Sequence, residues 1–225
     1  MILRLSTRFL SHAGWITTLC AVSLEAQTIA VAGTDTKSLV LLHPVVRQHF
    51  VCLDHPEGQL RYVGDALGAD CVIINPGAGS SGRWPAFYRT NGARNEDWYG
   101  WSQQVLAPFN GIVEAVHVNK LSNVPGTLGK ERASSVVFRR ADGVRVLYAH
   151  VQAISVAPGD SVRAGQPIAR VGNNGPSVMP HTHIGAWRDQ EPLQIRFDLR
   201  AMSKLSRQFE MVGDSAQPSG TLRPN

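Results

Sequence analysis

The sequence predicts a mostly β protein built on an antiparallel β-sheet. Glycine and proline are frequent, with 21 Gly and 13 Pro among 225 residues. Short runs with alternating apolar residues are bounded by turn residues, and few windows show helical periodicity. The 43% hydrophobic and 17% charged content excludes an intrinsically disordered protein. The length fits one medium domain with extensions.

The first extension is typical of a secretory signal peptide over residues 1–26. Arg4 and Arg8 precede a short apolar run at 14–24, which is shorter than the roughly 20 residues of a spanning helix. We therefore favour cleavage over a membrane anchor. We expect export to the periplasm or the exterior, with no transmembrane span.

The remainder of the chain divides into three parts by composition. Residues 27–38 are small and polar and are typical of a loose leader, whereas residues 201–225 end in a polar stretch typical of a flexible tail. Residues 39–200 contain no repeat and no long linker. We therefore expect them to form one domain.

The cysteines divide in the same way. Cys20 lies in the expected signal peptide, which leaves Cys52 and Cys71 in the mature chain. Two cysteines in an exported protein predict one disulfide, the alternative being two free buried thiols.

The domain carries a succession of strand patterns. Asp142-Gly143 lies between two apolar runs and predicts a hairpin turn. A moderate helical periodicity marks residues 199–209. The expected strand regions are 111–118, 134–138, 144–151, 156–172 (divided by glycines 159 and 165) and 181–187.

Three histidines are the strongest chemical signal. In an extended chain His181 and His183 point the same way, about 7 Å apart. His150 ends a neighbouring predicted strand. One imidazole of such a group can bind a metal while another acts on a water molecule or a substrate. Three histidines converging from two strands therefore predict a functional site.

These residues lie in a run that resembles a known family. The stretch 148–187, YAHVQAISVAPGDSVRAGQPIARVGNNGPSVMPHTHIGAW, resembles the signature region of lysostaphin-type zinc metallopeptidases. VLAPFNGIVEAV, RNEDWYGW and NVPG extend the resemblance, which covers roughly 50–198. It implies the duplicated hybrid motif fold of cell-wall endopeptidases. It also implies a zinc ion held by two histidines and one aspartate, which activates a water molecule. His183 then resembles a zinc ligand, and His150 and His181 resemble the pair that orients the water and stabilises the oxyanion.

The first half of the implied metal site departs from the usual pattern of the family, a histidine closely followed by an aspartate. Asp97 has a plausible position, but the residue four before it is Ala93. In divergent members the aspartate begins an apolar strand further upstream, which fits Asp70. His55 is then the nearest upstream histidine. Asp65 is the alternative aspartate, and another ligand pair or a broken site also stays open.

The two cysteines support the pairing of His55 with Asp70. Cys52 and Cys71 lie at odd offsets from these two residues, so an extended chain places each cysteine on the face opposite its neighbouring ligand. A Cys52–Cys71 disulfide would tie the two ligand segments together from behind. Closing a loop of this size stabilises the fold by about 3 kcal/mol in the chain-entropy model.

Two functions from different classes follow. The first is a zinc-dependent endopeptidase that hydrolyses peptide bonds in bacterial peptidoglycan, with Trp98 and Tyr99 as candidates to line its substrate groove. The second is a catalytically degenerate exported domain that binds the cell wall or regulates another wall hydrolase as its partner. The net charge is +5 for the full chain and +4 without Arg4, Arg8 and Glu25 of the signal peptide, and it suits a polyanionic wall. The scattered Lys and Arg residues provide no nucleic-acid motif, and no lysine between 130 and 204 fits a biotinyl-type carrier.

Overall fold

The computed structural model describes residues 39–79 and 84–205. The expected signal peptide (1–26) and leader (27–38) lie outside the described residues, so both stay predictions. Residues 199–205 are helical, in agreement with the periodicity over 199–209. Residues 201–205, which we expected to begin a flexible tail, belong to this helix.

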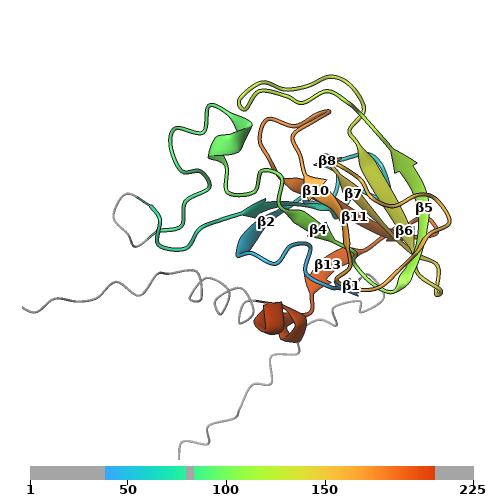
Figure 1. Ribbon diagram of the computed structural model, residues 1–225. Helices are drawn as coiled ribbons and strands as arrows, with labels where there is room; N and C mark the ends of the chain where they lie inside the picture. The colour runs from blue at the N-terminus through green and yellow to red at the C-terminus, as the bar shows by residue number, and fades with distance from the viewer. Residues whose placement is uncertain (1–38, 80–83, 206–225) are drawn as a thin grey trace, which may run out of the picture. The chain divides into compact units, whose positions relative to one another are not determined.

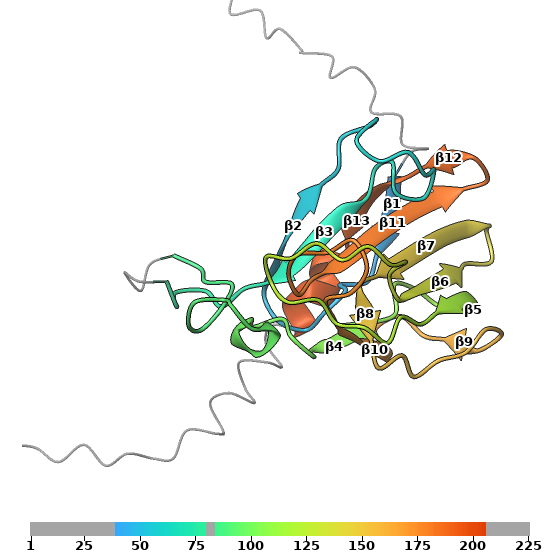
Figure 2. The same ribbon diagram turned by 90° about the horizontal axis from the view of Figure 1, so that it is seen from above.

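Strands from the whole described chain form one large antiparallel sheet. Its strands are β2 (Phe50–Asp54), β3 (Ala69–Ile73), β5 (Gly111–His117), β6 (Ser135–Arg139), β7 (Val144–Ala149), β9 (Ser161–Val162), β11 (Thr182–Arg188) and β12 (Glu191–Pro192). The order across the sheet is β2-β3-β11-β7-β6-β5-β9, and β12 pairs with β11 (Figure 2). The predicted fold class, mostly β with an antiparallel sheet, is confirmed.

Two smaller sheets accompany the large one (Figure 1). One is antiparallel and consists of β4 (Gln104–Leu106), β10 (Pro167–Val171) and β8 (Val151–Gln152). The other is a parallel pair of β1 (Leu39–Leu42) and β13 (Gln194–Phe197). A short 3-10 helix, η2 (Asn95–Asp97), lies in the long connection between β3 and β4.

The predicted hairpin joins β6 and β7. Gly143 adopts φ 85°, and its N–H donates to the carbonyl of Arg140 at 3.0 Å. Because φ values of this kind are favourable for glycine, Asp142-Gly143 supports the turn. The two strands then pair from Arg139 opposite Arg145 to Ser135 opposite Ala149.

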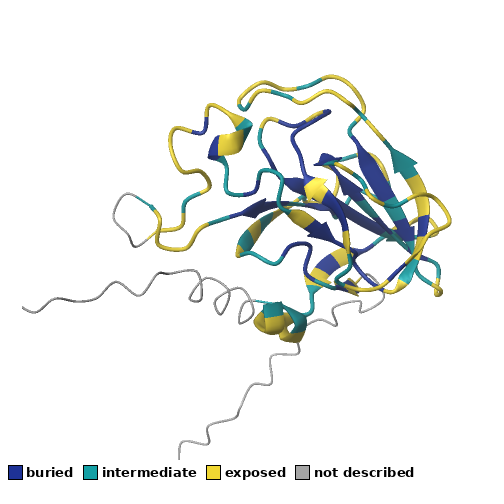
Figure 3. Cartoon of the chain, viewed as in Figure 1, coloured by how far each residue is buried: buried dark blue, intermediate teal, exposed yellow. Residues whose placement is uncertain are grey.

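Alternate residues of the large sheet fill the core. The side chains of Phe138, Val146, Tyr148 and Ile184 have no measurable exposure, and the Phe138 and Tyr148 rings meet edge to face at 5.4 Å. These residues form one apolar cluster with residues from both smaller sheets. Figure 3 shows these strands mostly in the dark blue of buried residues, under exposed connections.

The opposite face of the sheet holds the polar residues. Side chains alternate along a strand, so the neighbours of core residues point away from the core. Arg139 and Arg145 both lie near Glu114 on this face, at 3.3 and 3.0 Å. Asp70 and His183 alternate with buried apolar neighbours in the same way. The pleat of the sheet therefore decides which face carries the candidate site.

Candidate metal centre

Asp70 and His183 are direct cross-strand neighbours. Asp70 lies in β3 directly opposite His183 in β11. Asp70 Oδ1 is 2.8 Å from His183 Nδ1, with a hydrogen bond between them. Their flanking residues Cys71 and Ile184 point into the core. Two residues 113 positions apart in the sequence are thus placed by strand register alone.

His55 reaches the same face from β2. Leu53 pairs with Asp70 across the strands, and the pairing continues past β2, where the His55 N–H donates to the Gly68 carbonyl at 2.8 Å. Because His55 lies two residues after Leu53, it shares the face that Asp70 occupies. His55 Nε2 lies 3.3 Å from Asp70 Oδ2.

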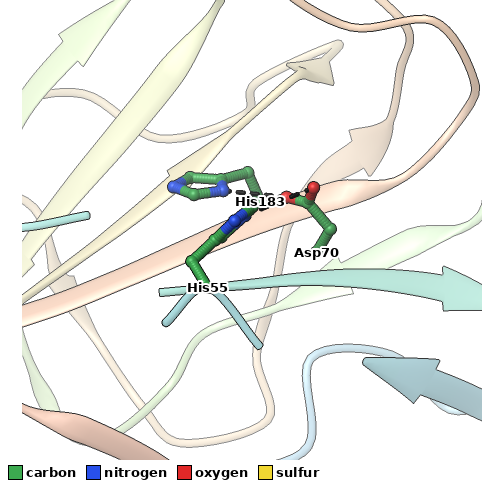
Figure 4. Close-up of side chains that lie close together, drawn as sticks. All are labelled: His55, Asp70 and His183. Carbon is green, nitrogen blue, oxygen red and sulfur yellow. Dashed lines mark hydrogen bonds and ion pairs between the residues drawn. The ribbon is translucent and has the colours of Figure 1, made fainter. Parts of the chain in front are cut away.

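The three side chains point toward one another (Figure 4). Each of His55, Asp70 and His183 offers one ligand atom, and these three atoms lie within 4.8 Å of one another. His–Asp–His is a donor set that zinc accepts. Together with its geometry, this set identifies a candidate metal centre.

The other two predicted histidines adjoin this group. His181 lies two residues before His183, and its Nε2 is 3.4 Å from Asp70 Oδ1. The His150 ring centre is 4.6 Å from that of His181 and 6.1 Å from that of His183. All three histidines are buried, at 5–7% exposure. The structure therefore brings together all five residues expected to carry the chemistry.

His150 occupies this place through an irregular backbone. It follows β7 with φ 60°, in the left-handed region that non-glycine residues rarely adopt. In a regular strand His150 would point to the same face as Tyr148, which is in the core. The left-handed backbone at His150 interrupts this alternation, and the His150 ring lies beside His181 instead of in the core. Such a conformation costs on the order of 1–3 kcal/mol and is common at functional sites.

Carboxylates surround His183 on both sides of its ring. Asp65 Oδ1 is 3.0 Å from Nε2, while Asp70 holds Nδ1. Burial opposes the charged form, but the hydrogen bonds to Asp65 and Asp70 outweigh it and raise the pKa of His183 to about 9. Burial likewise opposes ionisation of Asp70, yet hydrogen bonds with His181 and His183 hold its pKa well below the usual range. Both pKa shifts mean that the surroundings of Asp70 and His183 stabilise a positive charge next to ionised carboxylates.

His150 has the opposite electrostatic character. Burial, reinforced by the neighbouring His181, lowers the pKa of His150 to about 3. Its Nδ1 lies 2.7 Å from the carbonyl oxygen of Asn174. The neutral ring therefore donates its Nδ1–H to this carbonyl, which leaves the Nε2 lone pair free.

The unpaired atoms of His55 test whether a cation fits. Both ring nitrogens of His55 are buried without a hydrogen-bond partner. The 3.3 Å contact between Nε2 and Asp70 is therefore a close approach without hydrogen-bond geometry. Leaving a buried polar atom unpaired costs about 1–3 kcal/mol, and a cation between His55, Asp70 and His183 would remove this cost. The residues present fit a zinc ion.

The disulfide joins Cys52 to Cys71, which lie opposite each other in β2 and β3. Cys71 is in the core, whereas its neighbour Asp70 faces the candidate centre. The predicted disulfide is therefore present, and it connects the two ligand segments from the core side of the sheet.

The remaining predicted residues have other neighbours. The Trp98 indole N–H donates to the Gly92 carbonyl at 3.0 Å, and its ring meets that of Tyr88. The Arg89 guanidinium lies over the Tyr99 ring at 4.5 Å. Both aromatic residues are half-buried in the connection that contains η2. A groove role for them stays a prediction.

The sequence patterns did not predict a buried hydrogen-bond network around Asn174. Asn174 accepts the Ser134 N–H at 2.7 Å and donates to the Val151 carbonyl at 2.9 Å, while its own carbonyl meets His150. Ser177 lies 3.3 Å from His181 Nδ1, and the Met179 carbonyl lies 2.9 Å from the same atom. These contacts orient the two histidines. The adjacent asparagines between an apolar strand and Gly175 were the available signal.

The fold and the side chains together define a class: an antiparallel β domain with a candidate His–Asp–His metal centre and two further histidines beside it. Residues 99–195 match the model of Peptidase family M23. This match covers the part of the chain that contains His150, His181 and His183, and the resemblance inferred from the sequence is confirmed.

Known proteins are similar to this chain either over a short segment or over a longer part at low sequence identity. Over 60 residues the chain is 43% identical to the DD-carboxypeptidase/endopeptidase Mpg of Neisseria meningitidis serogroup B, and equally to the protein of that name from Neisseria gonorrhoeae. The match spans 27% of this chain and 14% of each relative. The catalytic domain of lysostaphin from Staphylococcus simulans is 20% identical with a TM-score of 0.38, covering 63% of this chain and 80% of that one. A chain of the SpoIIIAH–SpoIIQ complex is 18% identical with a TM-score of 0.44, covering 68% and 95%.

Within residues 39–79 and 84–205, no helix has the length and apolar character needed to cross a membrane.

Proposed function

We propose that this chain is an exported zinc-dependent endopeptidase that hydrolyses peptide bonds in bacterial peptidoglycan. The observation that carries the proposal is the convergence of His55, Asp70 and His183 ligand atoms within 4.8 Å. The match of residues 99–195 to a peptidase family supports the reaction class.

In this proposal His55 Nε2, the Asp70 carboxylate and His183 Nδ1 hold the zinc ion. When bound there, zinc would activate a water molecule and polarise the scissile carbonyl. Asp70 is the natural centre of the ligand set, since His55, His181 and His183 all approach its oxygens within 3.4 Å.

His150 and His181 act on the water and on the developing charge. The His150 ring, whose Nδ1–H is held by the Asn174 carbonyl, presents the Nε2 lone pair that accepts the proton of the attacking water. Once protonated, Nε2–H stabilises the negative charge on the former carbonyl oxygen or passes the proton to the leaving amine. The Met179 carbonyl aligns His181 from the other side of its ring, so that Nε2 faces the same space.

The compartment and substrate are supported by independent features. A disulfide is stable in an oxidising compartment, which agrees with export. The net charge of +5 falls only to +4 when Arg4, Arg8 and Glu25 leave with the signal peptide, and it favours residence on the polyanionic wall. Gly100, the residue after Tyr99, runs beside the segment before His181, since a Cβ at Gly100 would lie 3.7 Å from the Pro180 carbonyl oxygen. This proximity supports Trp98 and Tyr99 as part of the substrate groove.

One observation favours the second function, a degenerate domain that binds the wall or regulates a partner hydrolase. The family match begins at residue 99, so His55 and Asp70 lie outside it. If these two residues do not bind metal, His150, His181 and His183 would form a buried histidine cluster that lacks two of the three proposed zinc ligands.

Zinc content and muropeptide cleavage separate the two functions. The proposed enzyme purifies with about one zinc per mature chain or takes up one on addition, and it releases new peptide termini from purified peptidoglycan. A chelator abolishes this activity and added zinc restores it. Protein that binds the wall but holds no zinc and cuts no bond, even with added metal, would support the degenerate domain.

A further inference from the structure

Asp65 is the carboxylate on the far side of His183. The His183 ring lies between Asp70 at Nδ1, 2.8 Å away, and Asp65 at Nε2, 3.0 Å away. A ring protonated at both nitrogens can donate to both carboxylates, but a ring that binds a metal at one nitrogen keeps only one N–H. With a metal bound, His183 therefore donates to one carboxylate, and the other carboxylate lies on the side of the metal.

The contacts of the two aspartates decide which one shares the cation. Asp70 is approached by three histidines, whereas the contacts shown for the Asp65 carboxylate lead to His183. His55 and Asp70 belong to the group whose ligand atoms converge, and Asp65 does not. The cation therefore belongs on the Nδ1 side, and the N–H belongs on Nε2.

The loop that carries Asp65 is built against β11. The Asp65 N–H donates to the Tyr62 carbonyl, and the Gly68 N–H donates to the Asp65 carbonyl, each at 2.9 Å. A Cβ at Gly185 would collide with the Gly64 carbonyl and lie 2.9 Å from Asp65 Oδ1. Because residue 185 has no side chain, the loop can approach β11 closely enough for Asp65 to reach Nε2 of His183.

We propose that Asp65 is a positioning residue, not a metal ligand: its carboxylate accepts the Nε2–H of His183 and thereby fixes the tautomer that presents Nδ1 to the metal. This inference rests on the proposed zinc site. A carboxylate that holds the outer nitrogen of a ligating histidine fixes the ring orientation and increases the basicity of the ligand. Asp65 therefore raises zinc affinity without touching the ion.

Zinc affinity of the full mature chain tests this role by competition with a chromogenic chelator. For Asp65→Ala we expect one zinc per chain to be retained, with a Kd roughly 10–100-fold weaker than that of the unsubstituted protein. Asp65→Asn keeps an oxygen acceptor in the same place, so it restores part of the affinity. Glu57→Gln removes an exposed carboxylate from the same loop and leaves Kd unchanged.

Nitrogen-15 NMR of the histidine rings gives a readout that a merely structural role would not move. The zinc-loaded protein, and Asp65→Asn, show His183 protonated at Nε2 with a slowly exchanging proton. Asp65→Ala exchanges this proton rapidly.

Three results would overturn the positioning role. In the first, Asp65→Ala keeps its Kd within twofold and its slow proton. In the second, Asp65→Ala and Asp65→Asn both lose zinc stoichiometrically, as Asp70→Ala should, which identifies Asp65 as a ligand. In the third, the unsubstituted protein takes up no zinc, and this contradicts the proposed function as well.

Discussion

The candidate centre is assembled from two regions that differ in how closely they follow a known family. Residues 99–195 match the M23 model and provide His150, His181 and His183. Residues 39–79 lie outside that match and provide His55, Asp65 and Asp70. In the structure the two regions meet as adjacent strands, β3 and β11. Strand register therefore places Asp70, from outside the family match, next to His183, from inside it.

The regions also differ in what holds their residues in place. The matched region positions its histidines through buried amides and backbone carbonyls, as with Asn174 and His150. The unmatched region relies on a disulfide and on glycines that let a loop lie against β11. The two regions thus hold their candidate residues by different means.

The largest expected effect is the loss of metal from either region. Asp70→Ala and His183→Ala should each weaken zinc binding well beyond the roughly 100-fold expected for an outer partner, because each removes a ligand. His55→Ala should do the same. Zinc per chain and chelator competition measure this.

Asp54→Ala is the matched control for Asp70→Ala. Asp54 pairs with Ala69, so it points to the opposite face of the sheet and is exposed. If His183→Ala loses zinc while Asp70→Ala and His55→Ala keep it, the unmatched region provides no ligand.

The next effect separates metal binding from catalysis within the matched region. His150→Ala should retain one zinc and lose roughly 10²–10⁴-fold in the turnover of a peptidoglycan fragment, because the proton acceptor is removed. His117→Ala, at the end of β5, should leave both quantities unchanged. Full activity in His150→Ala would show that this histidine is not a catalytic residue.

A smaller effect concerns the disulfide behind the unmatched region. The double variant Cys52→Ser, Cys71→Ser should lower the free energy of unfolding by about 3 kcal/mol, as expected for a cross-link over 19 positions. Urea denaturation of the metal-free protein measures it. If stability is unchanged, the bond does not hold the two ligand segments together.

A further effect is a pH dependence of stability that His150 introduces. Its folded pKa of about 3 lies below the unfolded value of about 6.5, so the unfolded chain binds more protons between these values. The contribution of His150 to stability is therefore complete above pH 6.5 and is lost as pH falls toward 3. Metal-free His150→Gln should lose less stability than the unsubstituted protein over this interval. An identical loss would contradict a buried neutral His150.

Much of the fold and half of the site follow from sequence patterns. Asp142-Gly143 predicted the β6–β7 hairpin, and the spacing of His181 and His183 predicted their common face. The left-handed turn at His150 was not predictable, because a continuous strand through Val151 fits the apolar pattern equally well. Asp65 is not distinguishable from Asp70 in the sequence, since the difference depends on which side of the His183 ring each occupies.

The most direct test of the two-region centre is the anomalous scattering of zinc in crystals of the mature protein. We expect one ion about 2.0–2.2 Å from His55 Nε2, an Asp70 oxygen and His183 Nδ1, with Asp65 on Nε2 of the same ring. An ion bound without His55 and Asp70, or no ion in zinc-soaked crystals, would contradict it.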